Sequence, residues 1–94
     1  MNEHTIADYR LEIIVLQQRD TNLAKENGCR NKKEWFDFIK NSETDDTALA
    51  IINIAKRYDL PLERVAHDFD STMIIRVGAI LDRQTKQEQK GKAA

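Results

Sequence analysis

The residues with the clearest capacity for chemistry are a histidine and two aspartates that lie close together in the chain. His67, Asp68 and Asp70 have donor types that bind divalent metals, and in a helix His67 and Asp70 would lie on neighbouring faces. A protein metal site needs several ligands, and no second cluster of histidine or cysteine completes this one. We therefore predict a surface His67 and a helix-capping Asp70, with no bound metal and no other cofactor.

A second chemical group is the thiol of Cys29, which is the only cysteine in the chain. It precedes the start of a predicted helix and lies near Arg30 and Lys32, an environment that favours the thiolate. A cysteine nucleophile also needs a general base, and no histidine lies near it in the sequence. No phosphate-binding glycine loop, Ser-His-Asp set or pair of catalytic carboxylates stands out. The sequence therefore predicts a protein that is not an enzyme.

Residues 51–69, IINIAKRYDLPLERVAHDF, have the spacing of two helices joined by a short turn. The small Ala55 allows the helices to cross closely, Asp59 can adopt the left-handed conformation that the turn needs, and Val65 is expected in the core. This segment resembles the helix-turn-helix unit of many repressors. The resemblance implies that four residues occupy positions that contact bases and phosphates: Pro61, Leu62, Arg64 and His67.

The charge of this segment opposes the function that the resemblance implies. From Asp59 to Asp70 there are four acidic residues and one arginine, whereas DNA binding depends on neutralising phosphates with lysine and arginine. Basic residues on the flanks would compensate only if they shared one face: Lys56, Arg57, Arg76, Arg83 and Lys86. DNA binding is therefore the alternative, and two helices packed in a bundle is the main interpretation.

Capping residues and apolar periodicity predict five helices in one all-α domain over residues 1–85, with a disordered basic tail over 86–94. The first helix should run from about residue 6 to residue 27, capped by Thr5 and stopped by Gly28, and the second from about 32 to 41, capped by Asn31. Ser42 or Thr44 should cap a third helix that stops before Pro61. A fourth should cover 62–69, and Asp70 or Ser71 should cap the last.

The first predicted helix carries a heptad seam that is suited to pairing with a second copy of the chain. Five residues form this predicted dimerisation seam: Ile6, Tyr9, Ile13, Leu16 and Leu23. Asp20 lies on the same seam, where it would weaken a coiled coil while fixing its register. An ordinary long helix packed across the other four is the competing interpretation.

The second predicted helix contains half of the six aromatic residues in the chain. Trp35 and Ile39 are expected in the core, whereas Phe36 or Phe38 should point outward as an interface anchor beside neighbouring lysines. Together with the charged residues of the fourth helix they form the predicted partner-binding set: Trp35, Phe36, Phe38, Lys32, Lys33, Glu63, Arg64 and His67.

The 94 residues suit one small domain, a third of them are charged, and the net charge of −1 gives no general attraction to nucleic acid or anionic lipid. No apolar run reaches the length of a membrane span, and the N-terminal residues lack the apolar segment of a signal peptide, so a cytoplasmic protein is expected. The principal hypothesis is a regulatory or adaptor protein that binds, modulates or inhibits a partner protein through helical surfaces. The alternatives are a small helix-turn-helix DNA-binding regulator, and an assembly factor or chaperone that uses its long first helix.

Overall fold

The structure is a computed structural model that describes the backbone of residues 3–93 and the side chains of residues 4–85. Five helices follow one another, and no strand occurs within residues 3–93. Their bounds are α1 (Glu3–Glu26), α2 (Lys32–Ile39), α3 (Asp46–Tyr58), α4 (Leu62–Phe69) and α5 (Met73–Ala93). The predicted all-α fold with a long N-terminal helix and a central helix pair is therefore confirmed.

Three of the predicted helix ends form through local chemistry. Asn31 caps α2, and its side chain accepts a hydrogen bond of 2.9 Å from the backbone N–H of Glu34. Gly28, with φ of 76°, follows the end of α1, and Asp59, with φ of 52°, ends α3. Glycine adopts this left-handed region without cost, and aspartate tolerates it better than most other residues.

The cap of α3 differs from the prediction of Ser42 or Thr44. Asp45 is the capping residue, and its Oδ1 accepts from the backbone N–H of Ala48 at 3.1 Å. Asp45 is also buried, so its carboxylate satisfies the helix end and a second partner inside the protein at the same time. The capping bond accounts for the start of α3 at Asp46.

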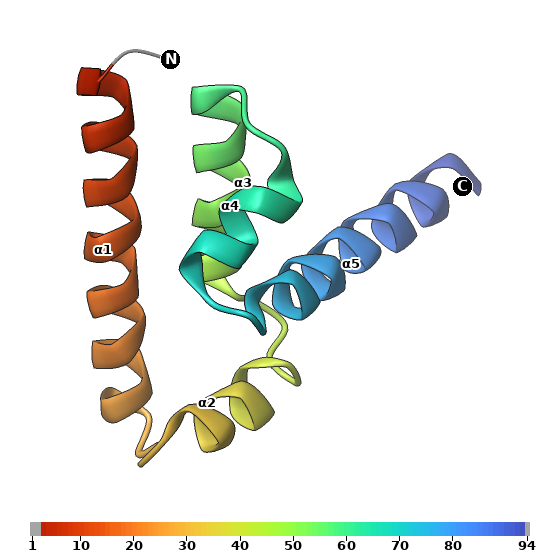
Figure 1. Cartoon of the computed structure of the whole chain (residues 1–94). Helices are drawn as coiled ribbons and strands as arrows, with labels where there is room; N and C mark the ends of the chain where they lie inside the picture. Colours follow the sequence, from red (N-terminus) through yellow and green to blue (C-terminus); the bar gives the residue numbers. More distant parts are fainter. Residues whose placement is uncertain (1–2, 94) are drawn as a thin grey trace.

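The core lies where α3, α4 and α5 pack together and α1 covers α3 and α4 (Figure 1). Its fully buried large side chains come from the last three helices: Ile51, Val65, Met73 and Val77. In Figure 1, α2 lies beyond the end of α1, and the second half of α5 extends away from the other helices. The left-handed turn at Asp59 lets α4 double back onto α3, as the helix-turn-helix spacing predicted.

The predicted dimerisation seam of α1 is mostly used inside the chain. Tyr9, Ile13 and Leu16 are buried in the core, whereas Ile6 and Leu23 remain partly exposed. These three residues pack against α3 and α4, so they are not available for contact with a second copy of the chain.

The domain bounds of 1–85 and the disordered basic tail at 86–94 stay predictions. Helix α5 continues through this segment to Ala93, in keeping with the good helix propensity of lysine, glutamine, glutamate and alanine. The side chains of residues 86–94 lie outside the described part of the structure.

Candidate functional site

A buried arginine on α5 is the centre of a network of buried hydrogen bonds and ion pairs. The guanidinium of Arg76 is 4% exposed and donates to Asp20 at 3.0 and 3.0 Å and to Asp45 at 2.8 and 2.9 Å. Burial disfavours its charged form, but the hydrogen bonds and charges of the two carboxylates outweigh this and raise the pKa of Arg76 above its ordinary value. We call Asp20, Asp45 and Arg76 the arginine cluster.

The arginine cluster also holds α2 against the rest of the protein. Asp20 accepts hydrogen bonds from the indole N–H of Trp35 at 3.0 Å and from the hydroxyl of Thr47 at 2.7 Å. The Arg76 guanidinium lies 5.8 Å from the centre of the Trp35 ring. Within the described residues, every buried side-chain nitrogen and oxygen has a partner, so the cluster carries no unsatisfied polar atom.

The arginine cluster was not predicted from the sequence. Asp20 was placed on the coiled-coil seam, Arg76 was placed among the basic residues that could support DNA binding, and Asp45 was given no role in either. A usable signal was present, because Arg76 lies on the same stripe as Met73, Val77 and Ile80, which faces the core. A charge at such a position requires a buried partner of opposite sign.

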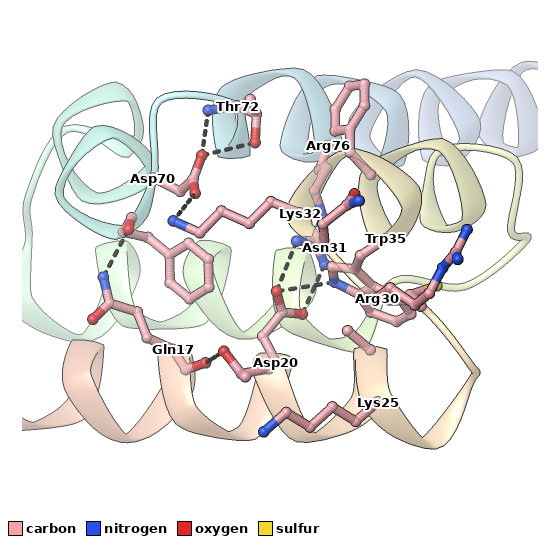
Figure 2. Close-up of a pocket in the computed structure, with 15 residues that line it drawn as sticks. Gln17, Asp20, Lys25, Arg30, Asn31, Lys32, Trp35, Asp70, Thr72 and Arg76 are labelled. Atoms are coloured by element: carbon pink, nitrogen blue, oxygen red, sulfur yellow. Dashed lines mark hydrogen bonds and ion pairs between the residues drawn. The ribbon is translucent and has the colours of Figure 1, made fainter.

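A cavity of about 430 Å³ opens beside the arginine cluster, between α1, α2 and the turn that joins α4 to α5 (Figure 2). Its lining includes the aromatic residues Trp35, Phe36 and Phe69, together with Asp20 and Arg76. Cys29 contributes to this lining and is half-buried. The cavity is therefore lined by both aromatic and charged groups.

A second depression of about 360 Å³ lies between α1 and α3. Its apolar lining comes from both helices: Leu11, Val15, Leu16, Ala50 and Ile54. Its polar edge is formed by Glu12, Arg19, Asn53 and Arg57. We call it the α1–α3 groove. Leu11 and Val15 of this lining are 59% and 49% exposed, and Ile14, which lies next to them on α1 outside the groove lining, is 60% exposed.

The predicted partner-binding residues of α2 separate into two groups. Trp35 and Ile39 are buried, as predicted, whereas Phe38 is 49% exposed and stacks on Trp35 with ring centres 5.7 Å apart. Phe36 is half-buried beneath the ammonium of Lys40. Lys32 and Lys33 are exposed, and the Lys32 ammonium lies 3.8 Å from Asp70.

The charged residues predicted on α4 face solvent. Glu63, Arg64 and His67 are all exposed, and together they edge a shallow depression away from the α1–α3 groove. Val65 is fully buried, as the helix-turn-helix spacing predicted. The exposed residues of α4 therefore include two carboxylates, Glu63 and Asp68, and one arginine, an arrangement that gives little attraction to phosphate.

Two further acidic residues of this region are engaged within the protein. Asp68 accepts from the Tyr9 hydroxyl at 2.6 Å, and burial together with this bond raises the pKa of Tyr9. Asp70 accepts from the backbone N–H and hydroxyl of Thr72 at 2.7 and 2.8 Å, which supports the start of α5. Burial opposes the ionisation of Asp70, but these bonds and the nearby Lys32 lower its pKa below the ordinary value.

The flanking basic residues do not form the common positive face that DNA binding would need. Arg76 is buried, Arg57 pairs with Glu12, and Arg83 donates to the backbone carbonyls of Ser42 and Lys40. The side chain of Lys86 lies outside the described part of the structure. Of the described side chains in this flanking set, three are thus committed to partners in the same chain.

The described residues contain neither a metal-binding cluster nor a membrane-spanning helix. No group of three or more histidine, cysteine, aspartate or glutamate side chains in this part of the chain is placed to hold a metal ion. None of its helices combines the length and apolar character that crossing a bilayer requires.

Comparisons of the chain with protein-family models, with curated protein sequences and with solved structures found no match.

Proposed function

We propose that this protein is a regulatory or adaptor protein that binds a partner protein, and that the partner places an amphipathic helix in the α1–α3 groove. The observation that carries this proposal is the exposure of Leu11, Ile14 and Val15 beside an apolar depression. Single exposed aliphatic residues are common on soluble proteins, but a contiguous group beside a groove is typical of an interaction surface.

The apolar contribution of this surface supplies part of the binding free energy, and the partner's own apolar residues must supply the rest. Full burial of a leucine, isoleucine or valine side chain contributes about 1.5–3 kcal/mol, so covering the exposed half of each contributes about 1 kcal/mol. Leu11, Ile14 and Val15 would together contribute about 3 kcal/mol before the partner's own residues are counted. Ordering costs reduce this value, which suits a reversible regulatory contact.

The charges at the groove edge favour a partner helix with acidic flanks. Arg19 and Arg57 lie on this edge with one carboxylate, that of Glu12. Glu12 already accepts from Arg57 and from the Tyr58 hydroxyl, so its charge is neutralised within the protein. A carboxylate of the partner helix near Arg19 would be attracted to its exposed guanidinium, and this contact would help to orient the partner helix in the groove.

Site-specific photocrosslinking tests the proposal. A benzophenone amino acid replaces Leu11 in one variant and Ile75, which is 56% exposed on α5, in the control variant. In the cells that encode the protein, position 11 should give a discrete protein adduct that position 75 lacks, and an added Arg19→Glu change should weaken it. Absence of an adduct at position 11, or the same adducts at both positions, would contradict the proposal.

A further inference from the structure

The cavity beside the arginine cluster has the size of a small-molecule site. Its volume of about 430 Å³ is within the range of about 300–1,000 Å³ that is usual for such sites. It is separate from the α1–α3 groove, because the two share no lining residue. A ligand here would therefore add a function to the proposed protein-binding role.

The aromatic wall of the cavity is fixed before any ligand arrives. The indole of Trp35 is buried, donates to Asp20 and packs against the Arg76 guanidinium. The rings of Phe36 and Phe69 complete this wall. Planar apolar groups pack well against such rings, and a wall that is already ordered loses little conformational entropy on binding.

The charges at the mouth of the cavity favour an anion. Figure 2 shows the Lys32 side chain reaching across the cavity toward Asp70, with Lys25 and Arg30 on the surrounding wall. The Lys32 side chain is 96% exposed and its ammonium is 3.8 Å from the Asp70 carboxylate. An exposed pair at this distance contributes little, so the ammonium is free to take a stronger acceptor.

The carboxylates that line the cavity are already supplied with donors. Asp20 is bound by Arg76, Trp35 and Thr47, and Asp70 is bound by the backbone and hydroxyl of Thr72. Arg30 is paired with Glu34 at 3.0 Å, so the positive groups that remain less fully neutralised than these carboxylates are the two lysines, Lys25 and Lys32.

We infer that this cavity binds a small molecule that joins a planar apolar group to an oxyanion, with the ring against Trp35, Phe36 and Phe69 and the oxyanion at Lys32 and Lys25. Carboxylate and phosphate share this chemistry. The ring sets the depth of the ligand in the cavity, and the ammonium groups at the mouth select for charge.

Titration by nuclear magnetic resonance with three probes tests the inference. The probes are 1-naphthoate, 1-naphthyl phosphate and the neutral 1-naphthalenemethanol. The chain has a single tryptophan, so the one indole N–H signal reports on the cavity wall. Saturable shifts of this signal and of the Lys32 amide are expected with at least one anion, and the better anion distinguishes carboxylate from phosphate. No indole shift with either anion, or equal binding of the neutral probe, would overturn the inference.

Matched lysine variants locate the oxyanion. Lys32→Ala should weaken binding of the better anion about tenfold, the loss expected for one charge-assisted hydrogen bond. Lys33→Ala should leave it unchanged, because Lys33 is an exposed neighbour that does not line the cavity. Arg19→Glu should also leave it unchanged, because Arg19 lines the α1–α3 groove and not the cavity, while it weakens the adduct formed by the crosslinker at position 11, so the two proposals can fail separately. An equal loss in the Lys32 and Lys33 variants would refute the assignment.

Discussion

Replacing Arg76 with methionine should destabilise this protein more than any surface ion-pair change. The variant leaves the carboxylates of Asp20 and Asp45 buried with their cation removed. Breaking a buried pair in this way costs about 3–5 kcal/mol, against a total stability of about 5–15 kcal/mol for an ordinary domain. For a domain of this size, a loss of 3 kcal/mol lowers the melting temperature by about 12 °C or more.

Urea unfolding followed by circular dichroism would measure this loss. Arg57→Met is the matched control, because it removes an exposed arginine from the ion pair with Glu12 and should cost about 0–1 kcal/mol. A triple variant, Asp20→Asn with Asp45→Asn and Arg76→Met, should recover part of the loss, because it leaves no buried charge unpaired. If Arg76→Met costs no more than Arg57→Met, then the account of the arginine cluster as an interdependent buried network is incorrect.

Three further predictions concern the α4 region. Tyr9→Phe removes the hydroxyl that donates to Asp68 and should lower the free energy of unfolding, measured in urea, by about 1 kcal/mol. An unchanged free energy of unfolding would show that this hydrogen bond does not stabilise the fold. The folded pKa of Asp70 lies below its ordinary 3.8, so its contribution to stability is present above that pH and is lost as the pH falls through the folded value. The wild type should therefore have a higher free energy of unfolding than Asp70→Asn at pH 6, and this difference should become smaller as the pH falls to 2. Fluorescence anisotropy with labelled duplex DNA at low salt should show no binding. Saturable binding that is weakened by Arg64→Ala would instead support the DNA-binding alternative.

The parts of the fold that could be predicted from the sequence depend on chemistry between near neighbours. Asn31 caps the helix that starts one residue later, Gly28 stops the helix before it, and Asp59 takes the left-handed turn before Pro61. Each of these outcomes is determined within a few residues. For the same reason the predicted range of α4, 62–69, agrees with the structure.

The arginine cluster and the exposed apolar face of α1 were harder to predict because they depend on pairings between distant residues. Arg76 is separated from Asp20 by 56 positions and from Asp45 by 31, and helical periodicity carries no information about which charges meet. The same limit applies to α1, where only packing against α3 and α4 decides that Tyr9 is buried and that Leu11 is exposed.

The attachment of α2 gives the protein a built-in optical probe. Trp35 and Ile39 are buried outside the main core, and the only indole of the chain donates to a carboxylate of the arginine cluster. Detachment of α2 would move that indole into water and shift its fluorescence emission to longer wavelength, whereas the ellipticity of the other four helices would persist. Fluorescence and circular dichroism that change at the same urea concentration would show that the whole domain unfolds in one step. An earlier change in fluorescence would identify α2 as a separate cooperative unit.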